Sequence, residues 1–108
     1  MRDVLMVFCT CPDWDEAMRL GRAIVDRELA ACVNVLPGVA SIYGWQGKVE
    51  QAQEVLLVAK TGSAQFDALR AYIEEAHTYD LPEVLALPVV DGNARYLDWI
   101  LANIKRAG

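Results

Sequence analysis

Residues 31–61, ACVNVLPGVASIYGWQGKVEQAQEVLLVAKT, predict two long β-strands joined by a tight turn at residues 45–48. The first arm, residues 32–43, would reach roughly 40 Å at about 3.3 Å per residue. The neighbouring helical segment, residues 14–28, would span only about 22 Å at about 1.5 Å per residue. Part of the hairpin must therefore be covered by something outside its own domain. Because free strand edges invite pairing with another chain, we expect an obligate oligomer whose sites lie between subunits.

The length and composition predict one domain that spans residues 1–108. The hydrophobic content of 55% exceeds the ordinary range, and the surplus fits an interface core. No apolar run approaches the roughly 20 residues needed to cross a bilayer, so we expect no membrane partner.

The charge pattern disfavours nucleic acid as a partner. The formal net charge is -5, and the basic residues are scattered among acids instead of forming a stripe. Residues 1–8 do not have the pattern of a secretory leader, and three cysteines without a disulfide-scaffold spacing are typical of reduced thiols. We therefore expect a cytoplasmic protein.

The first strand and helix are predicted by residues 4–25. Residues 4–10 form a continuous apolar run, as in a central strand buried on both faces. Asp13 can cap the following helix, with Glu16 three positions later completing a capping box. The predicted apolar stripe of that helix is Ala17, Leu20, Gly21, Ile24 and Val25.

The rest of the chain continues the alternation of strands and helices. Pro37-Gly38 should bend the first arm of the hairpin, and the second arm covers residues 48–61. Ser63 is a candidate N-cap for a second helix, which ends near His77 and has Phe66, Leu69, Ile73 and Ala76 on one face. Residues 83–90 predict another strand. Residues 91–93 then turn into a last helix with an apolar stripe of Tyr96, Leu97, Ile100, Leu101 and Ile104.

This order predicts the α+β class: a ferredoxin-like βαββαβ sandwich with an extra C-terminal helix and a long β-hairpin. Two helices would cover one face of a four-stranded antiparallel sheet. The other face should be polar in a monomer. The first strand, however, carries apolar residues at the positions that face either side of the sheet. The fold and the oligomer are thus mutually consistent predictions.

Eight short segments, taken together, resemble the CutA divalent-cation-tolerance proteins in order and spacing. They are TCPD (10–13), LAACVN (29–34), PGVASIY (37–43), WQGK (45–48), EVLL (54–57), HTYDLPE (77–83), LPV (87–89) and YLDW (96–99). The resemblance implies a ferredoxin-like protomer in a tight homotrimer held through its hairpins, similar in architecture to PII signalling trimers. It also implies a role in tolerance to copper and other divalent cations.

The same resemblance implies metal ligands at Cys9 and His77. Some members of the family carry two adjacent histidines where this chain has Ala76-His77. The proline and glutamate of the family's motif are replaced by Thr78 and Asp80. These departures remove one ligand and loosen the turn, so they predict weak metal binding.

The residues themselves leave two interpretations of the thiols and the imidazole. Cys9 and Cys11 are two apart on a strand and face the same side, and with an imidazole they suit Cu(I), Cu(II) or Zn. Buried cysteine, however, often serves as a small hydrophobe, which is also the simpler interpretation of Cys32. His77, the only histidine, is equally suited to a helix C-terminus.

A second group of candidates is expected to lie in an intersubunit cleft: Cys32, Lys60, Tyr79 and Glu83. Lys60 and Glu83 could close a subunit junction as a buried ion pair, which we favour, or could line a pocket for an anionic small molecule. Tyr43 and Trp45 at the hairpin tip are of the types that anchor protein interfaces.

The functional prediction is a metal-binding tolerance protein and not an enzyme, because no nucleophile-base set or phosphate-cradling loop is visible. One alternative is a PII-like signalling or structural scaffold that binds a small metabolite at the intersubunit cleft. Another is a redox enzyme that uses a thiol with His77 as base.

Overall fold

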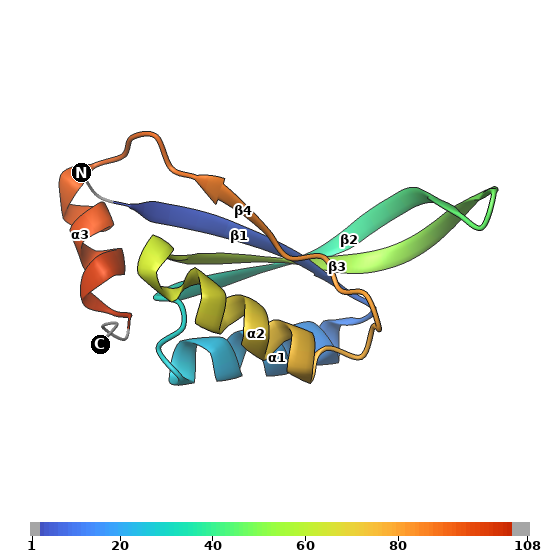
Figure 1. The fold of residues 1–108 in the computed structure, drawn as a ribbon, viewed down its shortest axis with the longest axis horizontal. Coiled ribbons are helices and arrows are strands. Elements are labelled where there is room, and N and C mark those ends of the chain that lie inside the picture. The colour runs from blue at the N-terminus through green and yellow to red at the C-terminus, as the bar shows by residue number, and fades with distance from the viewer. Residues whose placement is uncertain (1–2, 105–108) are drawn as a thin grey trace.

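The computed structural model describes residues 3–104, which form a four-stranded antiparallel sheet and three α-helices (Figure 1). The elements are β1 (Val4–Cys11), α1 (Trp14–Asp26), β2 (Cys32–Trp45), β3 (Lys48–Gly62), the 3-10 turn η1 (Ser63–Gln65), α2 (Phe66–Ala76), β4 (Leu85–Pro88) and α3 (Ala94–Ala102). The strands lie in the order β2-β3-β1-β4. The predicted α+β class and element order are confirmed.

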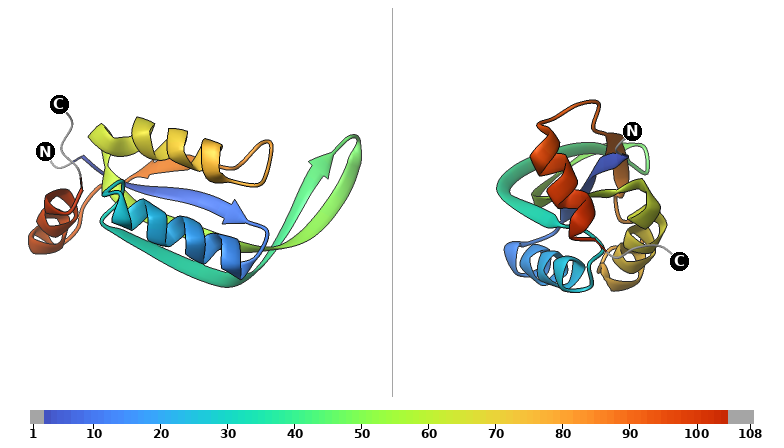
Figure 2. Two further views of the ribbon diagram at one scale, coloured as in Figure 1. Left: turned by 90° about the horizontal axis from the view of Figure 1, so that it is seen from below. Right: turned by 90° about the vertical axis from the view of Figure 1, so that its left-hand side faces the viewer.

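Helices α1 and α2 cover one face of the sheet, as the views in Figures 1 and 2 show. Strand side chains alternate between faces, so Val7, Cys9 and Cys11 of β1 point into this helix-covered side. There they join one buried cluster with residues of both helices and of β3, which includes Ala17, Leu20, Ile24, Val55, Leu57, Ala59, Leu69 and Ile73. The main core therefore lies between the sheet and these two helices.

Helix α3 lies at one end of the molecule (Figure 2) and forms a second, smaller core. Its Leu97 and Ile100 bury against Val4 and Ala31. At Gly62 of β3 an added Cβ would come within 2.9 Å of side-chain atoms of α3 and its C-terminal extension, so glycine permits this close approach. No helix within residues 3–104 combines the length and apolar character needed to cross a membrane.

The β2–β3 hairpin extends well beyond the rest of the sheet (Figure 1). The principal-axis extents of 44 × 25 × 22 Å reflect this arm, and the radius of gyration is 14.4 Å. A typical compact domain of this length would have a radius of gyration of about 13 Å. The predicted bend is present, because the strand register shifts between Leu36 and Val39 on either side of Pro37-Gly38.

The sheet face opposite α1 and α2 carries apolar residues, as predicted. Leu85 and Leu87 of β4 pair with Phe8 and Met6 of β1 and therefore share this face. Leu85 is 58% exposed, and Leu36 of β2 is also exposed. The chain by itself thus leaves a sheet face and a hairpin with uncovered apolar side chains.

Several local predictions differ from the structure. Helix α1 ends at Asp26 because Glu28 adopts a left-handed φ of 58°, and Val25 of the predicted stripe is 41% exposed. Ser63 begins η1 instead of capping α2, which starts at Phe66 without a side-chain cap. The last strand shortens to Leu85–Pro88, consistent with proline's inability to extend a hydrogen-bonded ladder.

The hairpin turn generates a testable prediction. Gln46 and Gly47 have φ of 51° and 77°, the left-handed pair that two-residue hairpin turns require. Gly47→Ala should therefore lower the free energy of unfolding by about 1 kcal/mol, whereas Gln46→Asn should not lower it, since asparagine tolerates this conformation. Urea denaturation would measure both. Equal losses in the two variants would contradict the assignment.

Candidate metal centre

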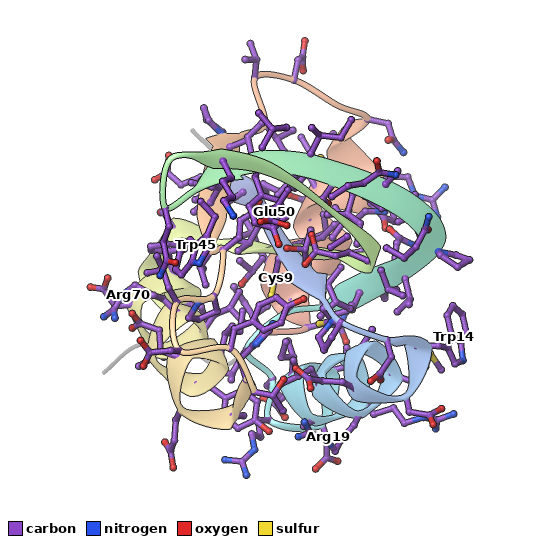
Figure 3. The ribbon with its side chains drawn as sticks, turned by 90° about the vertical axis from the view of Figure 1, so that its right-hand side faces the viewer. Cys9, Trp14, Arg19, Trp45, Glu50 and Arg70 are labelled. Atoms are coloured by element: carbon purple, nitrogen blue, oxygen red, sulfur yellow. The ribbon has the colours of Figure 1, made fainter. Side chains whose placement is uncertain are left out.

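Three potential metal donors lie close together on the helix-covered side of the sheet: the thiols of Cys9 and Cys11 and the imidazole of His77. Cys9 and Cys11 are 1% and 0% exposed, and His77 is also buried. One potential ligand atom from each residue lies within 4.8 Å of the others. Figure 3 shows Cys9 within the body of the protein, while Trp14 and Arg70 lie at its periphery. The structure thus brings together the two ligands predicted from the resemblance and adds Cys11.

His77 joins the end of α2 to β1. It follows the last helical residue, and its backbone N–H donates to Ile73 at 2.9 Å. Its Nε2 lies 2.8 Å from the carbonyl oxygen of Thr10, and its Nδ1 accepts the backbone N–H of Tyr79 at 3.0 Å. Because a backbone amide can only donate, Nδ1 is unprotonated and Nε2 carries the proton. The imidazole is neutral and bonded through both nitrogens.

Glu16 is a buried carboxylate whose spacing from Asp13 predicts only a role in helix capping. Asp13 does cap α1, with Oδ1 accepting the N–H of Glu16 at 2.8 Å. The Glu16 carboxylate instead accepts the Thr78 hydroxyl at 2.7 Å and the Thr78 N–H at 3.3 Å. Its Oε2 also lies 3.4 Å from His77 Nδ1. The position of Glu16, four residues before the buried Leu20, was the available signal that it faces the core.

The surroundings of Cys9 keep its thiol protonated. Hydrogen bonding with Cys11, then burial, then the charge of Cys11 raise the pKa of Cys9 well above its ordinary value. More distant carboxylates, Glu83 and Glu16, act in the same direction. A metal ion held by Cys9 would have to displace the thiol proton, because only the thiolate is a good ligand.

Tyr79 connects the loop after α2 to β3 by a side-chain hydrogen bond. Its hydroxyl donates to Glu54 at 2.9 Å, and its ring lies 4.7 Å from that of His77. Burial, together with this hydrogen bond, raises the pKa of Tyr79. The tyrosine hydroxyl therefore stays protonated and remains a donor to Glu54.

The remaining candidates, which were expected to lie in an intersubunit cleft, are not brought together within the chain. Lys60 Nζ lies 3.4 Å from the Tyr96 hydroxyl and 5.5 Å from its ring centroid, and no ion pair joins Lys60 to Glu83 within residues 3–104. Cys32 of β2 pairs with Lys60 of β3, and Lys60 pairs on its other side with Met6 of β1. That places Cys32 three residues from the level of Cys9, about 10 Å along the strand, and on the opposite face.

The aromatic residues of the hairpin tip lie far from the thiols and are solvent-accessible in the protomer. Trp45 is 54% exposed and Tyr43 is also exposed. Figure 3 shows Trp45 on the hairpin. Sequence reasoning anticipated exposed anchors at these positions.

Comparison with known proteins identifies the family. The model of the CutA1 divalent ion tolerance protein family matches residues 5–103. The chain belongs to the CutA1 family. It is 43% identical to the divalent-cation tolerance protein CutA of Thermus thermophilus, over 95% of this chain and 98% of that protein. It is 45% identical to the human protein CutA over 90% of this chain but only 54% of the human protein. The chain thus spans about half the length of that relative.

Solved CutA1 structures have the same fold. The Thermus thermophilus protein superposes with a TM-score of 0.93 at 42% identity, covering 94% of this chain and 99% of that chain. CutA1 from Oryza sativa gives a TM-score of 0.94 at 40% identity, covering 96% of this chain and 95% of that one. The predicted family resemblance is confirmed.

The contacts of Glu16 generate a prediction on stability. Glu16→Ala would leave the Thr78 hydroxyl and N–H without their acceptor, so it should lower the free energy of unfolding by about 1–3 kcal/mol. Asp15→Ala is a matched control, because this exposed neighbour contributes only through the helix dipole, worth about 0.3–1 kcal/mol. Guanidinium denaturation compares the two. Losses of equal size would show that the buried contacts contribute nothing beyond the helix N-terminal charge.

Proposed function

We propose that this CutA1 chain is a cytoplasmic homotrimer that supports tolerance to copper or another divalent cation by binding the ion weakly through Cys9 and His77. The observation that carries the proposal is the buried cluster of sulfur and imidazole donors within 4.8 Å of one another. Membership of a family named for divalent ion tolerance supports it.

The residues present fit such an ion. Thiolate and imidazole are the donors that copper and zinc prefer. Donor atoms that share a tetrahedral metal with bonds of about 2.0–2.3 Å are roughly 3.5–3.8 Å apart, so the donor atoms would have to move together by about 1 Å at most. A bound ion would supply Lewis acidity and positive charge. The chain's own residues position the donors, and the surrounding core excludes water.

We expect weak metal binding because of the hydrogen bonds that His77 already makes. Both ring nitrogens already hold hydrogen bonds, to Thr10 and Tyr79, so an ion must replace one of them. The raised pKa of Cys9 adds the cost of removing a proton. The same raised pKa disfavours the redox-enzyme alternative, because reactive cysteines have depressed pKa values. We therefore assign no catalytic role.

The trimer is supported by what the protomer leaves uncovered. Its strand order β2-β3-β1-β4, with both main helices on one face, supports the proposed ferredoxin-like sandwich. The open face exposes Leu85 and Leu87, and the hairpin exposes Tyr43 and Trp45. Apolar surface of this extent is typical of a subunit interface.

The proposed location in the cytoplasm rests on the thiols. Cys9, Cys11 and Cys32 are all free, as is usual in a reducing compartment. Relatives carry names that place them in a chloroplast or a periplasm. Fractionation of cells that produce the protein would test the location for this chain.

A PII-like scaffold is the second candidate function, and one observation favours it. Lys60 lies beside Tyr96, whose ring stacks on that of Trp99 at 5.5 Å. A cation next to exposed aromatic rings could bind an anionic planar metabolite at the proposed intersubunit cleft. Calorimetry with a nucleotide panel separates the candidates, since nucleotide heat without metal heat would favour the scaffold.

The proposed ligands generate a binding prediction. Cys9→Ser and His77→Gln should each weaken Cu(II) or Zn(II) binding at least tenfold, because each removes a donor from a site with few donors. Cys32→Ser is the control, since Cys32 lies on the other face of the sheet. Anaerobic isothermal titration calorimetry measures the affinities. Unchanged affinity in both ligand variants would remove the proposed site.

The trimer generates a separate prediction. Trp45→Ala should weaken assembly by about 2 kcal/mol or more per site, as expected for an aromatic anchor. Trp14→Ala, an equally bulky exposed tryptophan on α1, should leave assembly unchanged. Sedimentation velocity over a dilution series measures both. A wild-type protein that sediments as a folded monomer at every concentration would refute the trimer.

A further inference from the structure

We propose that Cys11 is a third metal ligand, and that Cys9, Cys11 and His77 together form a charge-neutral site for a thiophilic divalent cation of the zinc type. This inference rests on the proposed function and specifies its donor set and its ion. Neither the family model nor the resemblance assigns a role to Cys11.

The geometry of β1 places the two thiols together. Cys9 pairs with Leu57 of β3 and Cys11 pairs with Val55, so both side chains lie on the helix-covered face two residues apart. Each is essentially inaccessible to solvent. The two sulfur atoms lie within 4.8 Å of each other and of a ring nitrogen of His77, so the three donors form one cluster.

Charge balance is the reason for a second thiolate. A divalent ion held by Cys9 and a neutral imidazole alone would leave one net positive charge in a buried site. Two thiolates cancel the charge of a divalent ion, which burial strongly favours. On the same count of ion and donors, a monovalent ion with both thiolates would leave one net negative charge. The donor set therefore matches a divalent ion better than Cu(I), although thiolates suit both.

Glu16 is placed to support His77 as a ligand. Nε2 lies beside Thr10, the residue between the two cysteines, and Nδ1 lies 3.4 Å from Glu16 Oε2. If Nε2 holds the ion, the ring proton moves to Nδ1 and faces this carboxylate. Carboxylates commonly hold metal-bound histidines in this way and raise their basicity. The hydrogen bond from Tyr79 to Nδ1 would be given up.

The experiment uses Cd(II) and Zn(II) on the full chain under anaerobic, reducing conditions. Wild-type protein should bind one ion per chain, with a sulfur-to-cadmium charge-transfer band of two thiolates. Cys11→Ala should lose about half of that band and at least tenfold in Zn(II) affinity. Cys32→Ala should match the wild type. X-ray absorption on the wild-type zinc complex counts sulfur ligands without any substitution, and circular dichroism checks that each variant is folded.

The outcomes separate this inference from the proposed function. If Cys9→Ser loses binding while Cys11→Ala does not, or if wild-type zinc has a single sulfur ligand, the role of Cys11 is refuted and the Cys9–His77 site stands. If no variant of these three residues changes binding, both are refuted. A site that takes Cu(I) through two sulfurs but neither Zn(II) nor Cd(II) refutes the charge argument.

Discussion

The antiparallel pairing of β1 with β3 is the constraint on which the rest of the structure depends. It runs from Val4 opposite Gly62 to Cys11 opposite Val55. Side chains alternate along a strand, so this register sends Val7, Cys9 and Cys11 into the core and Met6 and Phe8 to the open face. A slip of one residue would exchange the two sets and put both thiols on the open face. The donor cluster and the apolar open face are two consequences of one register.

The polar groups near the thiols are tolerated inside the core because each has a partner. Glu16 holds Thr78, and His77 bridges Thr10 and Tyr79. No buried side-chain nitrogen or oxygen lacks a hydrogen bond within the described part of the chain. A satisfied network of this kind stabilises the protein, so an ion at the proposed site would compete with contacts that already stabilise the fold. The structural role of His77 and its proposed role as a metal ligand thus oppose each other, which would limit the affinity for an ion.

Much of the fold could be predicted from periodicity and turn chemistry, because these act locally. The apolar run of β1, the Asp13 cap and the bulge at Pro37-Gly38 are all such signals. Helix ends were less predictable: Glu28 terminates α1 through a left-handed conformation that glutamate rarely adopts. The short β4 strand depends on pairing with β1, a long-range contact that its own sequence does not encode.

The site was only partly predictable for a related reason. The spacing of Cys9 and Cys11 showed that they share a face, but only the tertiary fold brings His77, 66 residues after Cys11, beside them. Glu16 was missed because its capping-box spacing offered a sufficient local explanation. Lys60 and Tyr79 were grouped by sequence, yet each has a different partner in the protomer, Tyr96 and Glu54. Which of these residues lie together is determined by side-chain direction and long-range contacts, and residue type alone does not reveal it.

Hydrogen bonds of the loop after α2 connect the donor cluster to the hairpin. Tyr79 donates its backbone N–H to His77 and its hydroxyl to Glu54. Glu54 pairs with Val39, the first pair beyond the bulge, where the hairpin leaves the body of the sheet. An ion that frees His77 Nδ1 from Tyr79 therefore acts on a residue anchored at the base of the arm. Since that arm carries the exposed aromatic residues Tyr43 and Trp45, the proposed metal site and the proposed subunit interface share one structural element.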